Sequence, residues 1–192
     1  MRTIDIPIRE SITYSNSLKE EKECYIRIGN KEGCTYWSYI YFTLHLPMAL
    51  IIQSATLVLF KIPIEKSLNK RLFEERRHKG YCVIPTLEYM SEYSYCYKEP
   101  ELAIDLGTEF EACSYRAYTE IDITAISRSW FEDKLENKGI LLNSHSPKGY
   151  LQYAAAHYGV RFMRPFVRIK YKPMPMIVPG QTMEFPISIK KL

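Results

Sequence analysis

The side chains best suited to chemistry gather in one short stretch, residues 88–99, where carboxylates alternate with aromatic rings. Paired carboxylates in an aromatic cleft hydrolyse glycosidic bonds, so Glu88, Glu92 and Glu99 are the candidate acids. A polar surface loop has the same composition and is the alternative. Tyrosine rings also stack on sugars, with a carboxylate such as that of Glu92 orienting the ligand. The tyrosines of this stretch are Tyr89, Tyr93, Tyr95 and Tyr97.

A second aromatic set lies on a strand that the sequence predicts over residues 37–46. Trp37, Tyr39 and Tyr41 alternate with smaller or aliphatic residues and therefore share one side of that strand. The intervening residues, among them Ile40 and Phe42, are expected to face the core. These three rings are the other candidate platform for a polysaccharide.

The chain has five cysteines, and their spacing contains no C-x-x-C pair of the kind found in zinc ribbons and redox motifs. An odd number leaves at least one thiol without an intramolecular partner. Two interpretations stay open: buried, inert cysteines, and intermolecular disulfides that cross-link an assembled layer. The candidates for cross-linking are Cys24, Cys34, Cys82, Cys96 and Cys113.

Motifs for other chemistry do not occur. The sequence contains no G-x-S-x-G, H-E-x-x-H or G-x-x-x-x-G-K-[ST] motif. Its four histidines lack ligand spacing, although His145 and His157 flank one predicted strand pair and could meet in space. We therefore expect a protein that is not an enzyme, with no catalytic residues, no cofactor and no metal ion.

Composition favours a globular chain with a protein or glycan partner. In 192 residues the formal charge is +4 and the aromatic content 14%, so a nucleic-acid partner is not expected. No 18-residue apolar run and no signal peptide are visible. The expected location is a spore or cell surface that is reached without a secretion signal.

The elements that position these residues are mainly strands. Alternating apolar residues predict them at 3–8, 24–29, 37–46, 52–62, 81–87, 103–106, 150–156 and 160–171. Proline 7 suggests an edge or a bulge for the first strand. The very charged residues 66–79 are expected to form a solvated loop or a short helix.

The stretch from Glu120 to Asn143 organises the rest of the chain. A strand gives way to a short helix with Ile123, Ile126 and Trp130 on one face, capped by Asp122 or Thr124. A turn at 137–139 leads into a buried strand at 140–142. The sequence therefore predicts an antiparallel, jelly-roll-like β-sandwich over residues 1–171, with one short helix and a Pro-rich C-terminal extension over 172–192.

The order of motifs resembles the DNRLRE-type domain family. Glycine 29 and asparagine 30 are followed by YIYFTLHLP (39–47), SATLVLF (54–60) and SEYSYCYKEP (91–100), then by DITAISRSW (122–130), ENKGILL (136–142) and PFVRIKY (165–171). The resemblance covers nearly the whole chain to Tyr171. It implies a β-sandwich module of the type grouped with carbohydrate-binding modules and found in bacterial and archaeal surface proteins.

Two functions follow as expectations. One is a non-catalytic structural or adhesive protein of a spore coat or cell envelope, which assembles with itself or with other coat proteins. Residues Met183 to Ile189 could then add a strand to a neighbour's sheet edge. The other is a carbohydrate-binding module that recognises a polysaccharide through its surface aromatic rings.

Overall fold

The computed structural model describes residues 1–16, 24–47, 49–62, 77–91, 100–113, 116–145 and 149–174. Of residues 77–79 and 113 it describes the backbone alone. Every strand pair among these residues is antiparallel. The predicted all-β, sandwich-like fold with one short α-helix is confirmed.

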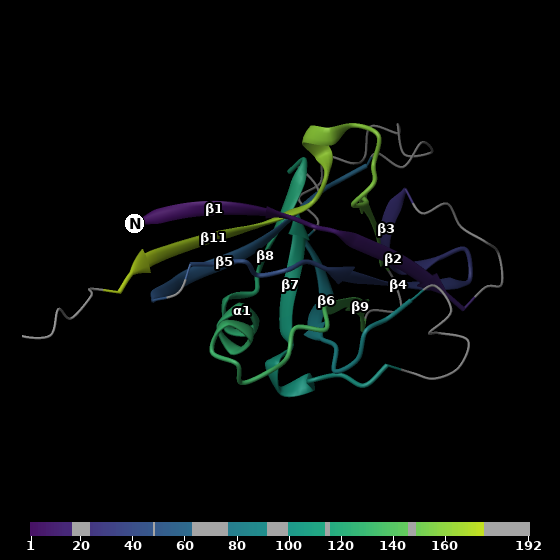
Figure 1. Cartoon of the computed structure of the whole chain (residues 1–192). Helices are drawn as coiled ribbons and strands as arrows, with labels where there is room; N and C mark the ends of the chain where they lie inside the picture. The colour runs from purple at the N-terminus through teal and green to yellow at the C-terminus, as the bar shows by residue number, and fades with distance from the viewer. Residues whose placement is uncertain are drawn as a thin grey trace, which may run out of the picture.

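One sheet has four strands in the order β1-β11-β5-β8. Its members are β1 (Arg2–Pro7), β11 (Phe166–Pro173), β5 (Leu50–Phe60) and β8 (Tyr118–Asp122). Figure 1 shows β1, β11 and β5 side by side, extending together from the rest of the molecule. β1 lies at the edge of this sheet, as the proline in its sequence predicts.

The other sheet has seven strands in the order β10-β3-β4-β9-β6-β7, and β2 also pairs with β4. These strands are β10 (Gly149–Ala154), β3 (Tyr25–Lys31), β4 (Cys34–Tyr41), β9 (Ile140–Ser144), β6 (Arg77–Pro85), β7 (Thr108–Cys113) and β2 (Glu10–Ser15). β2 occupies one edge of β4, because Tyr36 pairs with Ser15 on that edge and with Gly29 on the other.

The main core lies between the two sheets. Alternate residues of each strand point inward, as the period of two in the sequence requires. The four-stranded sheet contributes residues such as Leu57 and Val167, and the seven-stranded sheet contributes Ile28, Ile40 and Leu142, all with no exposed surface.

Consecutive strands β1 and β2 belong to different sheets, and the chain crosses between the sheets at residues 8 and 9. The Ile8 N–H donates to the Pro165 carbonyl at 3.2 Å, beside the four-stranded sheet. The next N–H, that of Arg9, donates to the Tyr41 carbonyl at 3.0 Å, in the seven-stranded sheet. Figure 1 shows β1 running on into β2 across the middle of the molecule, where the chain passes from one sheet to the other.

Helix α1 (Thr124–Phe131) packs its apolar face against the main core. Trp130 packs edge-on against Phe42 with ring centroids 5.5 Å apart, and Ile126 is fully buried. Ile123 holds the N-cap position and makes no side-chain cap bond, but Asp122 Oδ1 accepts the Thr124 N–H at 2.8 Å and so satisfies the first amide of the helix, as predicted. The Thr124 hydroxyl instead accepts the backbone N–H of Ala55 at 2.9 Å and ties the helix to β5.

Some elements differ from the sequence prediction. Strands β2 and β7 were not predicted, although Phe110 and Ala112 of β7 are buried between exposed glutamates. Residues 103–106, predicted as a strand, instead contain the short 3₁₀ helix η3 (Ile104–Leu106), whose turn is closed by the Gly107 N–H on the Ile104 carbonyl. A second 3₁₀ helix, η4 (Arg161–Met163), precedes β11.

Several predictions fall on residues outside the described part of the chain. They concern most of the charged stretch 66–79, the tyrosine-rich residues 92–99 and the C-terminal residues 175–192. The domain boundary expected at Tyr171 falls within β11, which continues to Pro173. Among the described residues, no helix has the length and apolar character needed to cross a membrane.

Candidate binding surfaces

The outer face of the seven-stranded sheet carries a second, smaller hydrophobic cluster. Residues from β2, β4, β9 and the segment after β6 bury one another there. The buried members are Tyr14, Tyr39, Met90 and Leu141, and Ile12, Trp37, Tyr41 and Leu102 pack around them. Much of the face that carries the predicted aromatic platform is therefore covered by the protein itself.

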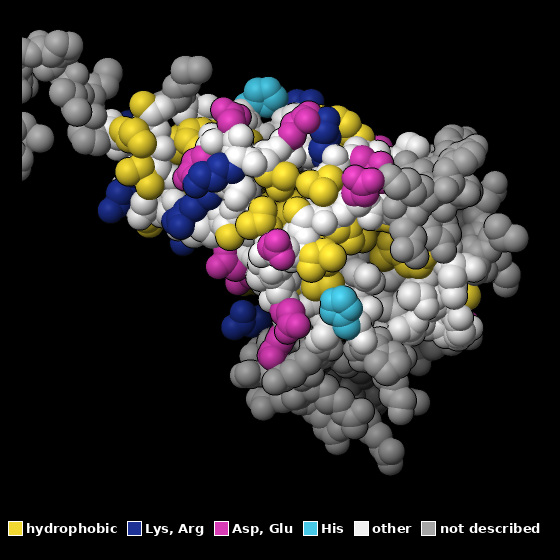
Figure 2. All heavy atoms as spheres, turned by 90° about the horizontal axis from the view of Figure 1, so that it is seen from below, with side chains coloured by type: hydrophobic (Ala, Val, Ile, Leu, Met, Phe, Trp, Pro, Cys, Tyr) yellow, Lys and Arg dark blue, Asp and Glu magenta, His cyan; other side chains and the backbone are white. Residues whose placement is uncertain are grey.

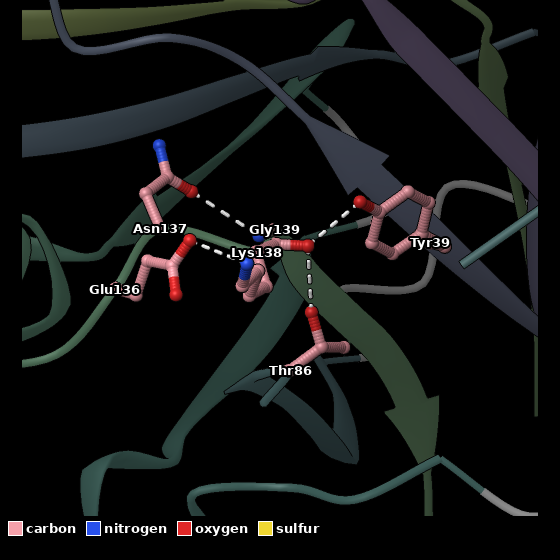
Figure 3. Close-up of polar contacts among 6 residues, drawn as sticks. All are labelled: Tyr39, Thr86, Glu136, Asn137, Lys138 and Gly139. Atoms are coloured by element: carbon pink, nitrogen blue, oxygen red, sulfur yellow. Dashed lines mark hydrogen bonds and ion pairs between the residues drawn. The ribbon is translucent and has the colours of Figure 1, made fainter. Parts of the chain in front are cut away.

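Tyr39 is buried, which corrects its prediction as a sugar-stacking residue. Only 1% of its surface is exposed. Its hydroxyl donates to the Lys138 carbonyl at 2.7 Å (Figure 3). Burial raises the pKa of Tyr39 far above its ordinary value. The ring is a packing element and offers no open face to a ligand.

The turn at residues 137–139 holds this tyrosine in place. Asn137 Oδ1 accepts the Gly139 N–H at 3.1 Å, and its Nδ2 donates to the Phe42 carbonyl at 2.8 Å. The Thr86 hydroxyl donates to the same Lys138 carbonyl as Tyr39, at 2.9 Å (Figure 3). The turn thereby joins β4, β9 and the end of β6 in one hydrogen-bonded unit.

Tyr41 and Tyr89 form an aromatic pair at the rim of this cluster. Their ring centroids lie 5.6 Å apart in an edge-to-face arrangement. Tyr89 is 55% exposed, and Lys138 Nζ lies 4.2 Å from its ring centroid. Trp37 is half-buried and stacks on Tyr14. Tyr89 therefore offers the most open ring of the four described candidates.

Of the three acids predicted in this loop, the structure describes Glu88. Glu88 Oε1 accepts the backbone N–H of Glu101 at 3.1 Å, which closes the base of the loop. Glu92, Tyr93, Tyr95 and Tyr97 lie outside the described residues, as does Glu99.

A different surface brings aromatic and cationic side chains together across β3, β4 and β10. The Arg27 guanidinium lies 5.5 Å from the Tyr25 ring centroid and 5.8 Å from that of Tyr36. Tyr36 packs edge-to-face on Tyr150 at 5.5 Å, and Lys31 Nζ lies 5.2 Å from the Tyr150 ring centroid. We call these five residues the tyrosine–arginine row.

The row combines flat apolar surface with positive charge. Tyr36 is buried at its centre, whereas its other four members are half-buried. Both hydroxyls of Tyr36 and Tyr150 are neutral hydrogen-bonding groups at neutral pH, and burial raises their pKa values above the ordinary 10.0. Rings with adjacent guanidinium and hydroxyl donors match the stacking and polar contacts that bind a sugar chain.

Two side-chain hydroxyls, the buried one of Ser38 and the half-buried one of Thr13, hold the backbone at the start of the row. Ser38 Oγ accepts the Arg27 N–H at 3.1 Å and donates to the Arg27 carbonyl at 2.8 Å. Thr13 Oγ1 donates to the Tyr25 carbonyl at 2.8 Å. These side chains take the place of backbone hydrogen-bond partners where β3 separates from β4. They thereby fix the backbone of Tyr25 and Arg27.

The sequence contains only part of the signal for this row. Tyr25 and Arg27 alternate with apolar residues within the predicted strand 24–29, a pattern that places them on one side of it. Tyr36 and Tyr150 join them because Gly29 is the cross-strand partner of both residues. That register is not visible in the chain itself, so the row was missed.

The described cysteines differ in their access to solvent. Cys24, Cys34 and Cys82 are all free thiols. Cys24 is exposed, Cys34 is half-buried, and Cys82 is 4% exposed. Burial also raises the pKa of the Cys82 thiol. The prediction that Cys82 cross-links is therefore wrong for the folded chain. Cys96 and the side chain of Cys113 lie outside the described residues.

Charge is mixed over the face of the molecule seen from below. Figure 2 shows hydrophobic side chains exposed between acidic and basic ones. The basic groups are denser toward the extended end of strands β1, β11 and β5. No single sign of charge covers this view.

The comparisons with known proteins add no family. A scan of the sequence against protein-family models finds no match, and a search of curated proteins finds none. The class that the fold defines is an all-β, sandwich-like protein, and membership of the DNRLRE-type family stays a prediction from the order of motifs.

Proposed function

We propose that this protein is a non-catalytic structural or adhesive surface protein that assembles with itself or with a partner. The observation that carries the proposal is the exposed, free thiol of Cys24, which directly precedes β3. An exposed thiol can form an intermolecular disulfide without unfolding. The motif order similar to DNRLRE-type domains fits a spore-coat or cell-envelope setting.

Non-reducing electrophoresis and light scattering over a concentration series test assembly. We expect oligomers that dissociate with reductant and that Cys24→Ala abolishes. Cys82→Ala is the matched control and should leave the oligomers unchanged, because that thiol is buried. A chain that is monomeric at high concentration with and without reductant would show that self-assembly is wrong.

The tyrosine–arginine row favours a second function, binding of a polysaccharide. A sugar ring that stacks on Tyr25 or Tyr150 would gain apolar contact, while the Arg27 guanidinium donates hydrogen bonds to its hydroxyls. The row is built from three strands of one sheet, so its groups are held in place before a ligand arrives.

Binding to a panel of neutral and acidic polysaccharides, measured by glycan array and affinity electrophoresis, tests this function. Tyr150→Ala and Arg27→Ala should each remove most binding, whereas Tyr89→Ala on the other surface should have little effect. Loss of binding in Tyr89→Ala alone would move the site to the Tyr41–Tyr89 pair. If no polysaccharide binds, this second function is wrong.

A further inference from the structure

A cysteine and a histidine meet on the outer face of the seven-stranded sheet, away from the tyrosine–arginine row. Cys82 lies on β6 and His145 directly follows β9. The Cys82 Sγ and the His145 Nε2 lie 3.3 Å apart. Thiol sulfur and imidazole nitrogen are the ligands that zinc-like divalent ions prefer.

The separation of these two atoms matches the demands of a tetrahedral ion. Zinc binds thiolate sulfur at about 2.3 Å and imidazole nitrogen at about 2.0–2.1 Å, and a tetrahedral angle then places the two ligand atoms about 3.5 Å apart. The observed 3.3 Å requires only a small adjustment. A metal ion between them would take the place of the thiol proton.

The backbone on both sides of the pair is firmly placed. Cys82 pairs with Asn143 of β9 on one side and with Glu109 of β7 on the other. The His145 N–H donates to the Gly80 carbonyl at 2.8 Å. The two ligands are thus held by three hydrogen-bonded strands, which keeps the entropy cost of binding an ion low.

The neighbouring strand offers a candidate third ligand. Glu109 is the exposed cross-strand neighbour of Cys82, and such neighbours have Cβ atoms about 4.5–5.5 Å apart. Among the described residues, no three His, Cys, Asp or Glu side chains already form a metal-binding group. Rotation of the Glu109 side chain would bring its carboxylate to the ion, and water would fill the remaining position.

We propose that Cys82, His145 and Glu109 form a binding site for one zinc-like divalent metal ion. The burial of Cys82, with 4% of its surface exposed, favours a small ion over an organic ligand, which could not reach the sulfur. Because His145 is exposed, an ion can enter by displacement of the imidazole from the thiol. The site is independent of the proposed self-assembly and polysaccharide binding.

Cobalt(II) titration of the reduced full chain, followed by absorption spectroscopy, tests the site. One ion per chain should bind with a thiolate-to-cobalt charge-transfer band and the intense visible bands of tetrahedral cobalt, and zinc(II) should displace it. Cys82→Ala should abolish the charge-transfer band. His145→Ala should weaken binding by at least roughly tenfold, and Glu109→Gln by a smaller factor.

Matched controls keep the result specific. Cys24→Ala, His157→Ala and Glu111→Gln change the same residue types elsewhere and should leave the titration unchanged. Circular dichroism of each variant shows that it is folded. Absence of a thiolate band in the wild-type chain, or a band that persists in Cys82→Ala, would overturn the proposal.

Discussion

At the scale of single residues, Gly139 shows how one backbone position decides where a side chain goes. Its φ of +103° lies in the left-handed region that disfavours other residues. A Cβ at this position would lie 2.4 Å from Tyr39 Cε2 and 2.8 Å from the Ile40 carbonyl oxygen. The glycine therefore permits both the turn and the burial of Tyr39 beneath it.

Gly139→Ala should reduce the free energy of unfolding by about 2–5 kcal/mol, because backbone strain and a steric clash add together. Urea denaturation measures the change. Gly159→Ala is the matched control, since nothing lies within 4 Å of its added Cβ. Equal effects of the two substitutions would contradict the role assigned to the turn.

At the scale of elements, helix α1 stabilises the sandwich by packing against its core. Its Trp130 is 5% exposed and its indole N–H has no hydrogen-bond partner among the described residues. Its contribution is therefore apolar contact. Asp122 is structural too, since its carboxylate accepts the first N–H of the helix.

Trp130→Ala should cost about 3–5 kcal/mol of stability, the usual range for a large buried aromatic residue. Trp130→Phe should cost less, because it also removes the unpaired N–H. Thermal and urea unfolding of both variants measure the difference. Trp37→Ala, which changes a half-buried tryptophan, is the comparison. A Trp130→Ala protein with wild-type stability would show that the helix does not stabilise the core through this residue.

The edge strand β1 is held to β11 partly by a charge pair. Arg168 donates from Nε and from a terminal nitrogen to the two Asp5 carboxylate oxygens, each at 2.8 Å. The hydrogen bond from Arg168 lowers the pKa of Asp5 below its ordinary value of 3.8. The pair therefore stabilises the fold above that value, and its contribution disappears as the pH falls through the lowered pKa.

Asp5→Asn should lower stability by less than about 1 kcal/mol near neutral pH, because the two side chains are 42% and 45% exposed. At a pH below the lowered pKa of Asp5 the variant and wild type should have the same stability. Urea denaturation over a pH series checks this. A constant difference across the series would assign the effect to something other than ionisation.

At the scale of the whole molecule, the core carries tyrosine hydroxyls that must stay protonated. Tyr39, Tyr81 and Tyr153 are all at most 1% exposed. Burial raises the pKa of Tyr81 to about 12 and the pKa values of the other two still further. In the unfolded chain these groups ionise near pH 10, so stability falls as the pH rises above that value.

Each of these tyrosines should lower stability by about 1.4 kcal/mol per pH unit above about pH 10. We expect a steep alkaline unfolding transition in which tyrosinate absorbance and loss of circular dichroism coincide. Tyr81→Phe should shift the transition to higher pH, since it removes one titrating group whose hydroxyl has no hydrogen-bond partner among the described residues. Tyrosinate absorbance of these groups without unfolding would contradict the burial.

Much of the architecture could be predicted from local pattern. Alternation located β1, β3, β4, β5, β6, β10 and β11, and the change of period near Ile123 located α1. The prediction failed where the local signal was weak. In β7 Glu109 and Glu111 alternate with Phe110 and Ala112, but glutamate is a poor strand former and the strand was missed. Residues 103–106 have too little alternation to exclude a 3₁₀ turn.

The candidate sites were predicted less well, because they depend on contacts between distant residues. Tyr39 was correctly placed on the side of β4 opposite the main core, but a second cluster covers that side. Tyr150 joins Tyr36 through the register of three strands, and His145 meets Cys82 across 63 residues of sequence.

The sequence by itself determined most of the strands, the helix and the apolar side of each, because those properties follow from neighbours within a few positions. The tertiary structure decided which apolar side lies under another segment, which thiol meets solvent and which tyrosines meet a cation. Those outcomes depend on the register of the strands and on which segment covers each face of a sheet. Residues far apart in the chain decide both.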